Sequence, residues 1–70
     1  MANRYTAITK KRGDWWIGWI EEVPGVNCQE RTEAELIDSL RTALQEAIQF
    51  NREDAIKAAA PDFTEVELVV

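Results

Sequence analysis

The segment Trp-Trp-Ile-Gly-Trp-Ile at residues 15–20 constrains the fold of this chain more than any other feature. Aromatic and β-branched residues favour a strand over a helix. Side chains alternate along a strand, which places Trp15, Ile17 and Trp19 on one face and Trp16, Gly18 and Ile20 on the other. Both faces are therefore apolar, so a sheet built around this strand needs a cover on each side.

Two further strands are predicted beside this segment. Residues 4–10 are rich in β-branched and aromatic side chains, and Gly13 in the polar stretch that follows can form the turn of a hairpin. Pro24 and Gly25 end the central strand because proline lacks an amide donor and glycine permits a turn. Residues 26–29 then predict a short third strand.

One main helix follows. Thr32 and Glu35 have the spacing of a capping box, in which each side chain satisfies an amide at the helix start. Apolar residues then recur at three- and four-residue spacing: Leu36, Ile37, Leu40, Ala43, Leu44, Ala47 and Ile48. Asn51 ends this helix or caps a second one over residues 51–60, and the sequence does not separate these two cases. Pro61 stops any helix, and the alternation of residues 63–70 predicts a fourth strand.

The expected fold class is α+β, with the order β-β-β-α-β and one main helix packed on one face of the sheet in two layers. With 70 residues, the chain has room for one modest core. We therefore expect a single domain, residues 1–70.

Composition argues against several classes of function. Thirteen acidic residues outnumber eight basic ones, giving a net charge of −5 that repels phosphate backbones, so the chain is not expected to bind nucleic acid by itself. Cys28 is the single cysteine, which excludes an intramolecular disulfide and favours a cytoplasmic location. No apolar run has the length of a membrane span, so no membrane association is expected.

No catalytic machinery is expected. The chain has no histidine, the commonest general base and metal ligand. A Mg²⁺ nuclease could in principle use Asp14, Glu21 and Glu22, but these residues lie at strand ends, where polar side chains are expected for structural reasons. Cys28 has no histidine to activate it, and a small apolar strand residue explains it better. We expect no enzyme activity, no metal and no cofactor.

The tryptophans indicate a binding surface instead. Trp15, Trp16 and Trp19 cannot share one face, so one set packs beneath the helix and the other leaves an aromatic patch outside. The residues expected to form the interface are Trp15, Trp16, Ile17, Trp19, Glu21 and Glu22. Core packing alone is the competing explanation for the three tryptophans.

The order of motifs resembles the HicB-like antitoxin family over about residues 4–50. The family combines an aromatic strand, a Pro-Glu-Leu-Pro-Gly type turn, a short strand ending in Gln-Gly and a Thr-x-Glu-Glu-Ala helix start. The matching residues are Glu22, Val23, Pro24, Gly25, Gln29, Thr32, Glu35, Leu40 and Ala43. Glu21 replaces a usual proline, Glu30 a usual glycine and Leu36 a usual alanine. Pro24, Gly25, Gln29, Thr32 and Glu35 are expected to be structural.

The resemblance implies a truncated ribonuclease-H-like fold and a function by occlusion. Family members typically bind a small basic (HicA-like) ribonuclease toxin and block its active site. Many members add a C-terminal DNA-binding domain, which is not expected within these 70 residues. The leading hypothesis is an antitoxin-like protein that is also a homo-oligomer. The alternative is a standalone homo-oligomeric binding or scaffold protein of the same fold, without a toxin partner.

Overall fold

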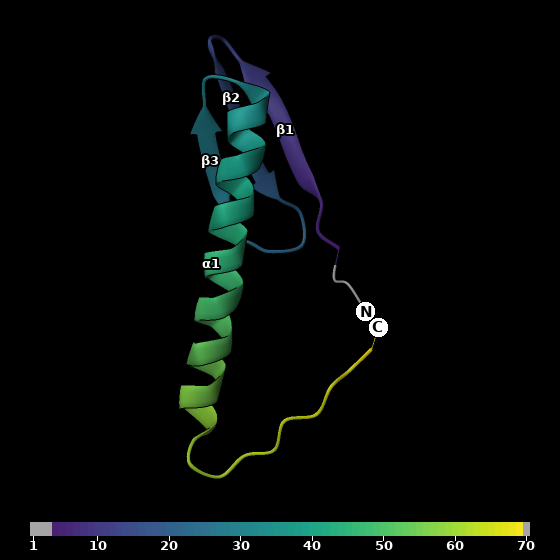
Figure 1. The fold of residues 1–70 in the computed structure, drawn as a ribbon, viewed down its shortest axis with the longest axis vertical. Helices are drawn as coiled ribbons and strands as arrows, with labels where there is room; N and C mark the ends of the chain where they lie inside the picture. The colour runs from purple at the N-terminus through teal and green to yellow at the C-terminus, as the bar shows by residue number, and fades with distance from the viewer. Residues whose placement is uncertain (1–3, 70) are drawn as a thin grey trace.

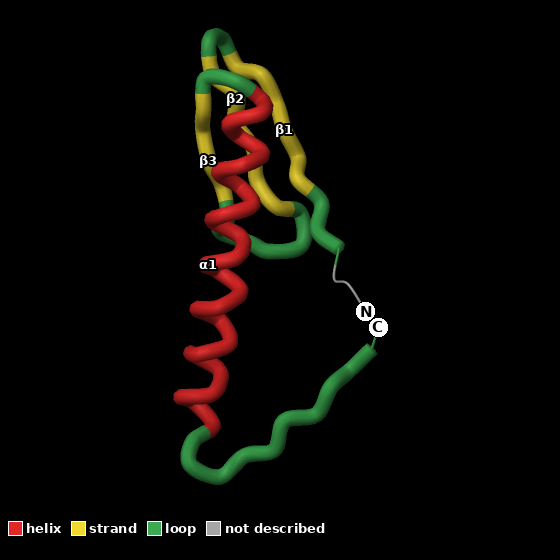
Figure 2. Tube along the Cα trace, in the orientation of Figure 1, coloured by secondary structure: helices red, strands yellow, loops and turns green. Residues whose placement is uncertain are grey.

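A computed structural model describes residues 4–69 and has an α+β fold in two layers (Figure 1). Within these residues there are three strands, β1 (Ala7–Arg12), β2 (Trp15–Ile20) and β3 (Asn27–Glu30), followed by one helix, α1 (Glu33–Ala59). The strands form one antiparallel sheet in the order β1-β2-β3. Figure 2 shows α1 crossing one face of this sheet and continuing well beyond it.

The predicted hairpin is confirmed, with shifted boundaries. Arg12 pairs with Trp15, so only two residues form the turn, and β1 extends two residues beyond its expected end. Gly13 takes a φ of +60° in this turn, a backbone conformation that residues other than glycine rarely adopt. β3 is also shifted, by one residue, from the predicted 26–29.

The helix begins where the capping box predicts. Thr32 has an extended backbone, and its hydroxyl oxygen accepts a hydrogen bond from the Glu35 backbone N–H at 3.2 Å. The same hydroxyl donates to Glu35 Oε1 at 2.8 Å. The prediction of a helix start at Thr32 is therefore confirmed, and Glu33 and Glu35 place negative charge where the helix dipole favours it.

The question of a second helix is settled in favour of one continuous helix. Asn51 lies inside α1, which runs without interruption to Ala59. The Ala60 backbone N–H donates to the Ile56 carbonyl oxygen at 2.9 Å, after which Pro61 cannot continue the helix. Within residues 4–69, this helix does not combine the length and the apolar character needed to cross a bilayer.

The core lies between the sheet and the first half of α1. Its buried members are Ile20, Val26, Leu36 and Leu40. Gly18 lets the helix approach the sheet, since a Cβ atom there would stand 3.1 Å from a methyl carbon of Leu36 and 3.1 Å from one of Leu40. The second half of α1 has no sheet beneath it, and Phe50 is 66% exposed.

The predicted fourth strand is wrong for the single chain. Residues 63–69 form no strand, and Val70 lies outside the described residues. The reason is the length of the helix. The 27 residues of α1 span about 40 Å at ~1.5 Å per residue, whereas the six residues of β1 span about 20 Å at ~3.3 Å per residue. The chain therefore leaves α1 about 20 Å beyond the sheet.

Candidate binding surface

The sheet face opposite the helix has no cover within residues 4–69 (Figures 1 and 2). Residues paired directly across antiparallel strands point to the same side of the sheet. The register therefore assigns eight side chains to this surface, which we call the open face: Ile8, Lys10 and Arg12 from β1, Trp15, Ile17 and Trp19 from β2, and Asn27 and Gln29 from β3.

Two indoles form the exposed aromatic part of the open face. Trp15 is 37% exposed and Trp19 is 42% exposed, with the half-buried Ile17 between them on the same strand. The guanidinium of Arg31 lies 4.1 Å from the ring centroid of Trp15, which is a cation–π contact. Arg31 thus fixes one edge of the aromatic surface and leaves Trp19 as its most accessible large side chain.

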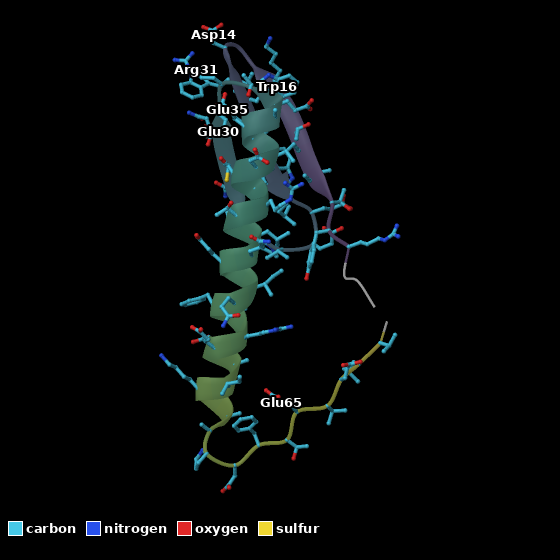
Figure 3. The ribbon with its side chains drawn as sticks, in the orientation of Figure 1. Asp14, Trp16, Glu30, Arg31, Glu35 and Glu65 are labelled. Atoms are coloured by element: carbon cyan, nitrogen blue, oxygen red, sulfur yellow. The ribbon has the colours of Figure 1, made fainter. Side chains whose placement is uncertain are left out.

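Trp16 belongs to the other face. It is half-buried and packs against the core beneath α1, between Lys11 and Glu30 on the neighbouring strands (Figure 3). The six predicted interface residues are therefore divided. Trp15, Ile17 and Trp19 share the open face, whereas Trp16 lies on the side that the helix covers.

Glu21 and Glu22 follow β2 at the end of the sheet away from the hairpin turn. Glu21 is exposed, and its backbone N–H donates to the Thr6 carbonyl oxygen at 2.9 Å. The Glu22 carboxylate accepts a hydrogen bond from the Thr6 backbone N–H at 2.7 Å, and this bond lowers the pKa of Glu22 below its ordinary value. Glu22 therefore ties the loop after β2 to the start of β1, which is a structural role.

The residues predicted to be structural lie at turns, at the helix cap or on the sheet. Pro24 and Gly25 lie in the loop between β2 and β3, where Gly25 has a φ of +89°. Thr32 and Glu35 form the helix cap. Gln29 differs from these because it is exposed on the open face, paired with Ile17.

Sequence reasoning missed the charge of the open face. The charged side chains that the register places there, Lys10 and Arg12, are both basic, and Arg31 at the margin is basic as well. The sequence pattern of β1 contained this information, because Ile8, Lys10 and Arg12 are spaced two residues apart and therefore lie on the same face of the strand. It could be used only once the two-residue turn had fixed which residues of β1 face Trp15 and Ile17.

The chemistry available to the described residues is limited. No three of their cysteine, histidine or carboxylate side chains cluster as metal ligands. Cys28 lies on β3 on the helix side, where burial and then the nearby Glu30 carboxylate raise the pKa of its thiol. A raised pKa keeps the thiol protonated at neutral pH and makes it a poor nucleophile.

Comparison with protein-family models, with curated proteins and with solved structures found no match to this chain.

Proposed function

We propose that this chain is a non-catalytic binding protein that docks another protein on the open face of its sheet. The observation that carries the proposal is the pair of partly exposed indoles, Trp15 and Trp19, on a face that no element of residues 4–69 covers. A tryptophan buries ~150 to 250 Å² in a packed interface and is enriched among residues that dominate binding energy. A pair of indoles held by a sheet is a preformed anchor for a partner.

The proposed partner is a small basic ribonuclease toxin of the HicA-like kind, which the chain would occlude as an antitoxin of a type II toxin-antitoxin pair. This part rests on the resemblance to HicB-like antitoxins, with their truncated ribonuclease-H-like fold, and on the net charge of −5. An acidic protein attracts a basic partner at long range and speeds their encounter. A cytoplasmic location is part of the same proposal.

The charges near the open face restrict how such a partner would dock. Lys10, Arg12 and Arg31 would repel its basic groups at the hairpin end, while Glu21 at the opposite end would attract them. We therefore expect the basic groups of the toxin to lie toward Glu21 and its apolar surface to cover Trp19.

Co-expression with the small basic protein encoded by a neighbouring reading frame tests this proposal. The tagged chain should co-purify with that protein and relieve its growth inhibition. Trp19→Ala should weaken binding by roughly tenfold or more, because it removes a central anchor. Phe50→Ala is the matched control, an exposed aromatic on the helix away from the sheet. Absence of both binding and rescue would contradict the antitoxin function.

A second candidate is a standalone homo-oligomer of the same fold with no toxin partner. It is favoured by the apolar segment after α1, which has no partner strand in the single chain. Light scattering separates the two candidates, because a chain that stays strictly monomeric contradicts the homo-oligomer and leaves the toxin partner possible.

A further inference from the structure

The segment 63–69 has the sequence of a strand but no strand partner. Phe63, Val66, Leu68 and Val69 are 46%, 73%, 81% and 68% exposed. Between residues 61 and 69, none of the described backbone groups hydrogen-bonds to another part of the backbone. Large apolar side chains in an unpaired, alternating segment are typical of a strand that completes a sheet elsewhere.

The sheet of the same chain is out of reach for most of this segment. α1 carries the chain about 20 Å past the sheet, as its length relative to β1 requires. An extended chain needs roughly six residues at ~3.3 Å each to return that distance. Only the last few residues of 63–69 could then lie beside β1 of their own copy.

β1 offers a free edge with a matching groove. Its described neighbour is β2 alone, so the backbone groups on its other side are available for pairing. On the helix side, an apolar groove lies along this edge. Apart from Arg41, its lining is apolar or aromatic: Tyr5, Ala7, Ile20, Ile37, Leu40 and Leu44.

The alternation of the segment fits both sides of this edge at once. Val66 and Leu68 share one face of an extended 63–69 segment, and Glu65 and Glu67 share the other. With Val66 and Leu68 directed into the groove, Glu65 and Glu67 lie on the open face. There they join Lys10 and Arg12 of β1, and opposite charges across neighbouring strands stabilise pairing.

The β3 edge fits less well. β3 has four residues, and its side chains on the open face are Asn27 and Gln29, which offer no positive charge to the glutamates of an added strand. The hollow on the helix beside it has two acidic side chains, Asp38 and Glu46, in its lining. Strand length and charge therefore both favour β1.

We propose that residues 63–69 of one copy add as a strand to the β1 edge of a second copy, and that the exchange is reciprocal. Each copy then gains a fourth strand, the exposed side chains of Val66 and Leu68 are covered in the groove, and the two equivalent contacts close a C2 dimer. The inference does not depend on the toxin partner, because it uses the sheet edge and the groove rather than the indoles.

Sedimentation equilibrium and hydrogen exchange on the full chain test the exchange. The expected mass is twice the 8.0 kDa of the chain. The amides of residues 64–69 should be protected by at least tenfold relative to unpaired amides. Leu68→Lys places a charge in the groove and should halve the mass, with the helical circular dichroism retained because residue 68 lies outside α1.

A charge exchange gives the specific control. Glu65→Lys with Glu67→Lys, or Lys10→Glu with Arg12→Glu, should each weaken the dimer by at least tenfold, and all four changes together should restore it. Three outcomes would overturn the inference: a monomer of 8.0 kDa at all concentrations, protection of the amides of residues 64–69 in a monomer, or failure of the variant with all four substitutions to regain the dimer.

Discussion

Gly18 is the residue on which the packing of the two layers depends most directly. A Cβ at this position would stand 2.6 Å from the Ile8 carbonyl oxygen, in addition to its close approach to Leu36 and Leu40. A carbonyl of the paired strand cannot move away without disturbing the sheet. The absence of a side chain at Gly18 thus sets how closely α1 lies against β2.

Gly18→Ala is expected to lower the free energy of unfolding by about 1 to 3 kcal/mol, the usual cost of overpacking a core. Urea unfolding followed by tryptophan fluorescence measures it. Thr9→Ala is a useful comparison, because Thr9 pairs with Gly18 across the strands and the change removes a partly exposed side chain, with its hydrogen bond to Glu33 Oε2, without overpacking. Equal stability of Gly18→Ala and the native chain would contradict the close packing.

Leu36 is fully buried beneath the sheet, with 0% of its surface exposed. Leu36→Ala should cost about 2 to 5 kcal/mol, a large share of the roughly 4 to 10 kcal/mol that a chain of this length has in total. Phe50→Ala should change the unfolding free energy by less than about 0.5 kcal/mol, as most exposed substitutions do. A change of less than about 1 kcal/mol in the unfolding free energy of Leu36→Ala would contradict a core centred on Leu36.

The Glu22 carboxylate gives the fold a dependence on pH. Its pKa is lowered from 4.5 by the hydrogen bond from Thr6. The native state therefore favours the charged form, and this stabilisation is present above pH 4.5 and lost as the pH falls through the lower native pKa. Glu22→Gln should make stability fall less steeply on acidification, as acid titrations of unfolding would measure, and an unchanged slope would contradict this role of Glu22.

Elements whose cause is local could be predicted from the sequence. Strand β2 follows from its aromatic and branched residues, and the start of α1 follows from Thr32 and Glu35. The division of the three tryptophans between two faces was predicted, but which face the helix covers was not. That choice depends on Gly18, which only a packed structure identifies as the point of closest approach.

Removal of the helix cap should destabilise the whole fold. Thr32→Ala leaves the Glu35 backbone N–H without its side-chain acceptor and is expected to cost ~0.5 to 2 kcal/mol. Thr32→Ser keeps the hydroxyl and should recover most of the loss. Thermal unfolding of both variants by circular dichroism checks this, and an unchanged midpoint for Thr32→Ala would contradict the role of the cap.

At the scale of the whole molecule, the sheet and helix are mismatched in length. The sheet covers only the first half of α1, one sheet face is left open, and the chain after α1 lies far from its own sheet. The sequence did not predict this mismatch, because it left open whether the helix ends at Asn51. The helix continues to Ala59, and this extra length places residues 63–69 far from the sheet. The proposed contact with a second copy at β1 follows from this mismatch, whereas the proposed partner on the open face follows from α1 covering the other face alone.

The indole N–H signals of the three tryptophans provide the most direct test of the open face. A soluble paramagnetic agent should broaden the signals of Trp15 and Trp19 more than that of Trp16 in the free protein. Addition of the small basic protein from the neighbouring reading frame should protect Trp19 and leave Trp16 unchanged. Equal broadening of all three signals, or a complex in which Trp19 stays fully accessible, would contradict the open face as the docking surface.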